Sequence, residues 1–344
     1  MGYRHHITLT IPAQVSCLSF IDACQLLVGS DDGSVRLYGL DTYKVLKAIR
    51  GLGPISSVAF QSQSPATQLW VAAGRQALRF SLGTDKLVLT SSDALQILDI
   101  GVDDDDNVGE FTINVKGTKM AFCTDSGSVG VVDLETNEVA RMKQSHNSVC
   151  GSVRFIPGRP SELVSVGYDH ALLHFDFMQR SMLSRDDLTA APPSSGVSLS
   201  PRSYSLYRCH QLGILAAGTA DGRLYVGTGG EKSSEASGVR QRRQRKWKGL
   251  KIDGRIIADV AEGPVVALAF TEARELLTCT LLGKVTQYRI CGSAAGGTLK
   301  LESQWIGESK NTYKVNSIAF SGGSIVIGGF QEDGKGVIEV WSAC

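Results

Sequence analysis

Three side chains that can exchange protons lie close together in the middle of the sequence: His146, Ser165 and Asp169. An imidazole between a hydroxyl and a carboxylate activates the serine nucleophile of acyl-transfer enzymes. In hydrolases that nucleophile often occupies a Gly-x-Ser-x-Gly turn, and the sequence around Ser165 has no such turn. A carboxylate that accepts an imidazole N–H also satisfies a histidine buried in a core. The sequence therefore favours a structural group and predicts no catalytic residues.

A second segment with chemical potential is the basic run RQRRQRKWKGLK, which follows the small, polar stretch Gly229–Gly238. Three interpretations of it stay open. It is a nuclear or nucleolar targeting signal, or an RNA or DNA contact in which cations neutralise phosphates and a tryptophan stacks on a base, or a solvated loop. The residues concerned are Arg240, Arg242, Arg243, Arg245, Lys246, Trp247, Lys248 and Lys251.

The elements that must position these residues are predicted to be short strands, which repeat along the sequence. Segments ending in phenylalanine, such as VSCLSF (Val15–Phe20), are each followed by a Leu/Val-rich strand, a tight turn and a third alternating strand. A four-strand unit repeated along the whole chain predicts an all-β fold, a β-propeller, which usually serves as a binding surface. Six or eight units are alternatives to seven, because unit two offers two candidate outer strands and unit five begins irregularly. The seven predicted units begin near Val15, Ile55, Val108, Val149, Tyr204, Val265 and Val315.

The two ends of the sequence complement each other. The last unit stops after three strands, at Val337–Trp341 plus three residues, and the strictly alternating Ile7–Ile11 can supply its fourth strand. Such pairing removes two exposed edges and closes the ring. We therefore expect a single domain over residues 1–344, with the N-terminal strand completing the last blade.

The residues of unit four resemble a motif of the WD-repeat (WD40) family, whose blades often join a His, a Ser or Thr, an Asp and a Trp in a hydrogen-bonded tetrad. Here His146, Ser165 and Asp169 match the first three members, and Phe175 stands where the family has tryptophan. Because phenylalanine has no N–H, the network should stop at three members. The resemblance implies a seven-bladed β-propeller of the WD40 type. The stretch from 102 to about 183, with TDSGSVGVVDL and SHNSVCGSVRFIPGRP, resembles one member of that family in particular.

The resemblance also indicates which residues share a face. In WD-repeat propellers, the connection between blades and the turn between the second and third strands lie on the narrower top face. We expect a partner-binding rim there, formed by Asp31, Asp103, Asp104, Asp105, Asp106 and Tyr168. This rim either receives a basic peptide or is a solvated surface. The Pro/Ser-rich loop at 189–201 should lie on the same side, and the basic insertion at 229–251 on the opposite side.

Composition limits the classes of function. The chain has 344 residues, of which 42% are hydrophobic and 20% charged, and its net charge of +1 excludes whole-surface attraction to nucleic acid or membrane. No apolar run is long enough to span a bilayer, and the N-terminus lacks a secretion signal. The eight cysteines form no CxxC pair, and the six histidines show no metal-ligand spacing. We expect reduced thiols, no metal, no cofactor and no small-molecule substrate.

These observations predict a non-catalytic interaction scaffold or adaptor, monomeric apart from its partner complexes, in the nucleus or cytoplasm. It would bind a protein or peptide on its top face. An RNA-associated nuclear or nucleolar factor, of the ribosome-assembly type, is one alternative. A substrate receptor of a cullin–RING ubiquitin ligase is another, although the WDxR box common in that group is missing after Asp133 and Asp176.

Overall fold

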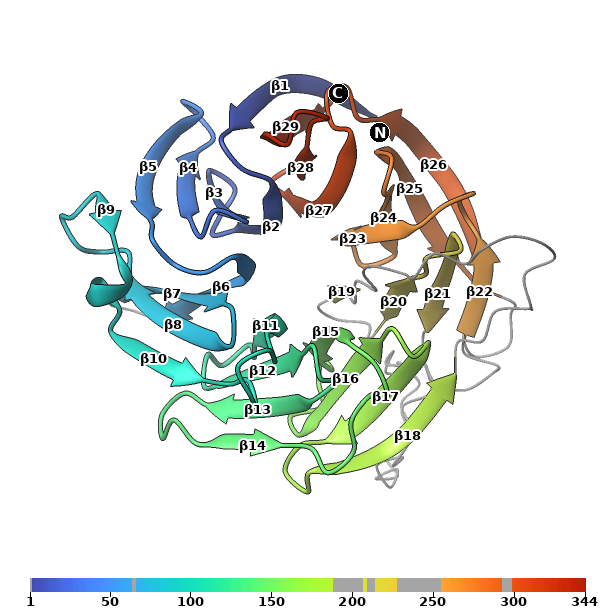
Figure 1. Cartoon of the computed structure of the whole chain (residues 1–344). Helices are drawn as coiled ribbons and strands as arrows, with labels where there is room; N and C mark the ends of the chain where they lie inside the picture. Colours follow the sequence, from blue (N-terminus) through green and yellow to red (C-terminus); the bar gives the residue numbers. More distant parts are fainter. Residues whose placement is uncertain (1, 64–65, 188–206, 209–213, 228–254, 293–298) are drawn as a thin grey trace, which may run out of the picture.

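Seven antiparallel β-sheets surround a central axis in the computed structural model of the chain (Figure 1). The structure describes residues 2–63, 66–187, 207–208, 214–227, 255–292 and 299–344. Every blade has four strands that we letter a to d from the channel to the rim, and blade one has a fifth outside these. The predicted seven-bladed propeller is therefore confirmed, and the alternatives of six and eight blades are wrong.

The first four blades hold the strands up to Asp187. Blade one comprises β2 (Val15–Phe20), β3 (Gln25–Ser30), β4 (Val35–Gly39) and β5 (Lys44–Ile49). Blade two comprises β6 (Ile55–Gln63), β7 (Ala66–Ala73), β8 (Gln76–Ser81) and β10 (Gln96–Asp99). Blade three comprises β11 (Val108–Ile113), β12 (Lys119–Thr124), β13 (Val129–Asp133) and β14 (Val139–Arg141). Blade four comprises β15 (Cys150–Phe155), β16 (Glu162–Gly167), β17 (Ala171–Asp176) and β18 (Ser181–Asp187).

The remaining three blades complete the ring. Blade five comprises β19 (Tyr207–Arg208), β20 (Leu215–Gly218), β21 (Arg223–Gly227) and β22 (Arg255–Asp259). Blade six comprises β23 (Val265–Glu272), β24 (Glu275–Thr280), β25 (Lys284–Cys291) and β26 (Lys300–Glu308). Blade seven comprises β27 (Lys314–Ser321), β28 (Ser324–Phe330), β29 (Gly336–Ala343) and, as its outer strand, β1 (Tyr3–Ile11).

The core lies between neighbouring blades, because strands b and c are apolar on both faces. Trp70, Phe122 and Phe175 are fully buried, each on the middle strands of its blade. Burying a large apolar side chain stabilises the fold by about 1.5–3 kcal/mol. The blades are thus held together mainly by apolar packing, whereas polar contacts fix the positions of their loops.

The ring is closed by pairing between the two ends of the chain, as predicted. Strand β1 runs antiparallel to β29, with Ile7 opposite Val340 and Ile11 opposite Gly336 (Figure 1). An aromatic cluster reinforces the joint, because the ring of Trp305 on β26 lies 5.1 Å from Tyr3 and 6.0 Å from Trp341. Blade six therefore also contributes to the closure.

The two candidate outer strands of blade two both exist, but they belong to different blades. Strand β10 is the outer strand of blade two, whereas β9 (Val88–Leu89) pairs in parallel with β5 and adds a fifth strand to blade one. The N–H groups of Ala48 and Arg50 donate to the carbonyls of Leu87 and Leu89, each at 2.9 Å. A 3-10 turn, η1 (Ser91–Asp93), then leads the chain back to β10.

Candidate functional site

The loops that connect consecutive blades (d–a loops) and the b–c turns lie on one side of the ring, because the four strands of a blade alternate in direction. We call this side the top face. Backbone hydrogen bonds join the two kinds of loop within a blade: Asp125 N–H donates to Asn107 O at 2.9 Å, and Leu281 N–H donates to Pro264 O at 2.9 Å. At these blades the loops of the top face are therefore fixed relative to each other.

Glycines in several b–c turns link a blade to the d–a loop that follows it. Leu52 N–H donates to Gly33 O at 3.2 Å, and His146 N–H donates to Gly127 O at 3.0 Å. Both glycines have positive φ, and a Cβ at Gly33 would lie 1.9 Å from the carbonyl oxygen of Leu52. Only glycine fits such a close approach in this backbone conformation.

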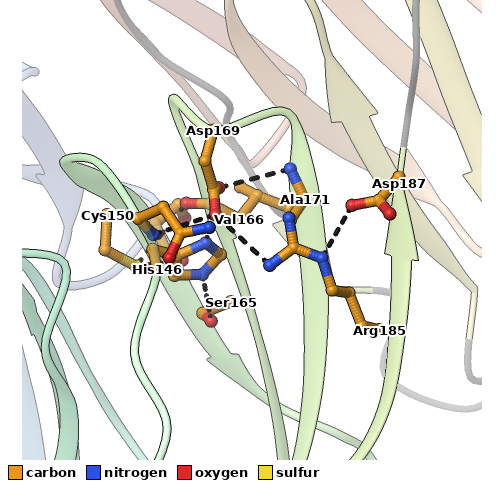
Figure 2. Close-up of polar contacts among 10 residues, drawn as sticks. His146, Cys150, Ser165, Val166, Asp169, Ala171, Arg185 and Asp187 are labelled. Atoms are coloured by element: carbon orange, nitrogen blue, oxygen red, sulfur yellow. Dashed lines mark hydrogen bonds and ion pairs between the residues drawn. The ribbon is translucent and has the colours of Figure 1, made fainter.

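The His–Ser–Asp group predicted in blade four is brought together by hydrogen bonds (Figure 2). His146 Nδ1 donates to Asp169 Oδ1 at 2.8 Å, and a second 2.8 Å hydrogen bond joins His146 Nε2 to Ser165 Oγ. The side chain of His146 and the whole of Ser165 are 0% exposed. Because the hydroxyl is sealed from solvent, this group is arranged to hold the blade rather than to attack a substrate.

The network is larger than the three members expected. Phe175 is buried at the tryptophan position and adds no hydrogen bond, as the sequence implied. Asp169, however, also accepts the N–H of Asn147 at 3.0 Å, and its Oδ2 lies 3.6 Å from a guanidinium nitrogen of Arg185 on β18 (Figure 2). No periodic pattern in the sequence indicated this cation, which comes from the outer strand of the same blade.

These contacts set the charges of the pair. Burial alone would raise the pKa of Asp169, but the N–H of Asn147 and the imidazole of His146 hold that pKa below its ordinary value. Burial alone would lower the pKa of His146, but the Cys150 thiol and the Asp169 carboxylate raise it. The pair is thus an ionised carboxylate beside an imidazole that gains a proton readily.

The acidic run between blades two and three divides into two parts. Asp103, Asp104 and Asp105 are exposed on the top face, and Asp104 forms a 2.5 Å ion pair with Arg75. The prediction that Asp106 is an exposed residue of the partner-binding rim is wrong, because Asp106 is only 2% exposed.

Asp106 instead accepts hydrogen bonds from within the fold. The N–H groups of Val102 and Ser126 donate to it at 2.9 Å and 2.8 Å. These bonds outweigh the effect of burial and hold the pKa of Asp106 below its ordinary value. This carboxylate ties the d–a loop to the b–c turn of blade three.

The other predicted rim residues differ in exposure. Asp31 is exposed, and its pKa is raised by partial burial and by the adjacent Asp32. Tyr168 is half-buried and packs against the apolar cluster between blades four and five. Asp31 is therefore available to a partner, whereas Tyr168 is shared with the core.

Sequence reasoning missed Glu339, a fully buried carboxylate on β29. It accepts the N–H groups of Lys310 and Asn311 at 2.9 Å and 2.7 Å, the Thr312 hydroxyl at 2.9 Å and the Trp341 indole N–H at 3.3 Å. A signal was present, because Glu339 interrupts the apolar run of a strand two residues before a tryptophan.

Several predicted features lie outside the described residues, namely the Pro/Ser-rich loop at 189–201 and the basic insertion at 229–251 with its residues Arg240 to Lys251. Among the described residues, no group of three or more His, Cys, Asp and Glu side chains could hold a metal ion. Across the same part of the chain, no helix has the length and apolar character needed to cross a membrane.

Seven four-stranded blades, a closing strand from the N-terminal end and the His–Ser–Asp group of blade four define a WD40-type β-propeller. No protein-family profile matches the chain. The chain is similar to the WD repeat-containing protein 53 homolog of Dictyostelium discoideum, with 24% identity over 177 residues. WD repeat-containing protein 53 is also the member that the stretch 102–183 resembles. The match covers 50% of this chain and 46% of the relative, so it spans about half the length of each.

Solved structures agree in fold. The β-propeller domain of Cps50 (Swd1) from Myceliophteria thermophila superimposes with a TM-score of 0.69 at 14% identity, covering 99% of this chain and 100% of that one. The WD40 β-propeller domain of Doa1 gives a TM-score of 0.68 at 14% identity, covering 99% of this chain and 97% of that one. At such identities the likeness shows the fold alone.

Proposed function

We propose that this protein is a non-catalytic scaffold that binds a protein partner on its top face. The observation that carries the proposal is the backbone hydrogen bonding between b–c turns and d–a loops, for example Asp125 N–H to Asn107 O and Tyr168 N–H to Val149 O at 2.8 Å. A surface fixed in this way loses little entropy on binding. The WD-repeat relative and the WD40 propeller fold support an interaction scaffold in general.

The exposed acidic side chains of this face indicate the charge of the partner segment that binds on one side of the ring. Asp31, Asp103 and Asp105 are exposed, and none of them has an ion pair among the described residues. Carboxylates that lack a cation in the free protein can accept one from a partner without breaking an internal contact. We infer that a basic segment binds over blades one to three.

The proposal is tested by identifying the proteins that lie close to the chain in cells. Replacing Asp31, Asp103 and Asp105 with lysine should remove a reproducible group of partners in proximity labelling. The matched control replaces Asp41, Glu135 and Glu138, exposed acids at the c–d connections of the opposite face, with lysine. Partner sets that are unchanged by the top-face variant, or equally changed by the control, would refute the proposal.

RNA binding through Arg240–Lys251, nuclear localisation, membership of a ubiquitin ligase, the monomeric state and the single domain over 1–344 stay predictions of the sequence. Alanine at Arg242, Arg243, Arg245 and Lys246 separates two of them. Loss of salt-sensitive RNA binding by the purified chain indicates a contact surface, whereas loss of nuclear accumulation alone indicates a targeting signal.

A further inference from the structure

Two exposed large apolar side chains lie in neighbouring loops of the top face, where blades six and seven meet. Leu282, in the b–c turn of blade six, is 70% exposed, and Tyr313, in the d–a loop of blade seven, is 46% exposed. Val315 N–H donates to Leu281 O at 2.9 Å, and Ser309 N–H donates to Gly283 O at 2.9 Å. These bonds fix the two loops side by side.

A third ring orients the tyrosine. Tyr313 N–H donates to Phe330 O at 2.9 Å, and the two rings meet edge to face with centroids 6.3 Å apart. We call the surface formed by Leu282, Tyr313 and Phe330 the aromatic patch. A tyrosine that is held by its neighbours and still exposed is the kind of side chain that contributes strongly to protein–protein affinity.

The lysines around the aromatic patch have no carboxylate partner in the part of the chain that the structure describes. The ammonium group of Lys314 lies 5.5 Å from the centroid of the Tyr313 ring. Among the described residues, no carboxylate lies within 4.0 Å of the ammonium groups of Lys284, Lys310 or Lys314. An incoming carboxylate could therefore pair with these lysines without displacing an internal acid.

The carboxylates nearest to these lysines are placed away from the channel or are occupied. Glu308 ends the outer strand β26, and Glu332 lies in the b–c turn of blade seven. Asp333 pairs with Lys335 at 2.7 Å, and Glu339 is buried and fully hydrogen-bonded. Lys314, in contrast, begins the inner strand β27 and so lies closer to the channel than these carboxylates.

The position of the aromatic patch in the ring relates it to the acidic rim. In a ring of seven blades, the junction between blades six and seven is diametrically opposite blade three, as Figure 1 shows. Blade three carries Asp125, and Asp103 and Asp105 precede it. The top face thus carries acidic side chains near blade three and lysines on the opposite side of the channel mouth, near the junction of blades six and seven.

We propose that the aromatic patch binds an extended segment of a protein partner that presents an apolar side chain next to acidic residues. This inference rests on the proposed function of the top face and names the partner's chemistry at a second place on it. The apolar side chain packs on Leu282 and Tyr313, and the acidic residues pair with Lys310 and Lys314. The charge difference across the face sets the direction of the segment.

The experiment is selection of a random phage-displayed peptide library on the purified full chain. Enriched peptides should carry leucine, isoleucine or phenylalanine beside aspartate or glutamate. The affinity of a synthesised, selected peptide is then measured by fluorescence anisotropy. The double variant Leu282→Ser/Tyr313→Ser should weaken binding by about tenfold or more. The double variant Lys310→Glu/Lys314→Glu should do the same and should reduce the dependence on salt.

The matched control is Met178→Ser, which removes an equally exposed apolar side chain at a c–d turn of the opposite face and should leave binding unchanged. Circular dichroism melting shows that each variant folds. Failure to enrich any peptide, or enriched peptides that bind the aromatic-patch variants normally, overturns the inference. Basic peptides that lose binding with Asp103→Lys/Asp105→Lys would support the proposed function while overturning this inference.

Discussion

Three buried carboxylates each anchor a d–a loop by accepting backbone N–H groups, and each lies at a different position in its blade. In blade four, Asp169 of the b–c turn accepts Asn147 N–H from the d–a loop, whereas in blade three Asp106 of the d–a loop accepts Ser126 N–H from the b–c turn. In blade seven, Glu339 of strand c holds the d–a loop. Where the repeat is degenerate in sequence, as in blades three and seven, a buried carboxylate therefore still anchors the d–a loop.

The sequence could identify only one of these carboxylates. Asp169 falls at the position where the WD-repeat motif has an aspartate, so spacing was sufficient to find it. Asp106 and Glu339 stand at positions where the motif has none. Their role depends on which backbone N–H groups the fold brings to them, and a residue's type does not encode that.

Replacing Asp169 with asparagine should lower the free energy of unfolding by about 1–3 kcal/mol, because the buried imidazole and the Arg185 guanidinium lose their anion. Urea unfolding measures the change. Asp103→Asn, an exposed acid on the same face, is the control and should leave stability within about 0.5 kcal/mol.

The loss of stability caused by Asp169→Asn should depend on pH, both below pH 3.8 and above pH 6.5. Asp169 has a folded-state pKa below its ordinary 3.8, so it contributes stability above pH 3.8 that is lost as pH falls through the folded-state pKa. His146 has a folded-state pKa above its ordinary 6.5, so its contribution is complete below pH 6.5 and is lost as pH rises through that pKa. The difference between natural chain and variant should be largest between pH 3.8 and pH 6.5, and a flat difference would contradict the assignment of the ion pair.

Among the structural elements, the inner strands were the most predictable. Six of the seven begin within one residue of the predicted positions, and the predicted start of the irregular unit five, Tyr204, lies outside the described residues. Alternation of buried and exposed side chains is a local property that sequence records directly. The pairing of β9 with blade one was not predictable, because a two-residue strand carries no period and its partner belongs to another blade.

The b–c turns allow a test of how strictly blades are joined. Gly33→Ala should destabilise the fold more than Gly334→Ala. Both glycines have positive φ, +73° and +82°, and each substitution costs about 1–2 kcal/mol on that ground. Only at Gly33 would the new Cβ meet a backbone, that of Leu52, while nothing lies within 4 Å at Gly334.

Urea unfolding of the two glycine variants measures the difference. Equal costs would mean that the contact between blade one and the loop before blade two tolerates displacement.

For the whole molecule, the sequence was sufficient for the architecture and insufficient for the partner. Repetition over the chain and the complementary ends predicted seven blades and their closure. Which top-face residues are exposed depended on the folded loops, as the contrast between Asp105 and Asp106 shows. The aromatic patch joins residues from two loops and the end of β28, so no single segment of the sequence contains it.

Removing residues 1–12 should destabilise the entire ring rather than blade seven alone. The deletion exposes the edge of β29 and removes Tyr3 from its contact with Trp305. Thermal unfolding should shift to lower temperature in one step, and a synthetic Tyr3–Ile11 peptide added in trans should restore part of the loss. An unchanged melting temperature would contradict this role of β1.

The pairing of β1 with β29 also has a consequence for biosynthesis. A ribosome makes β1 long before β29, and at about 5–20 residues per second β1 waits tens of seconds for its partner. During that time an alternating strand with a free edge is open to wrong pairing. The growing chain therefore needs protection of β1 until β29 has been made.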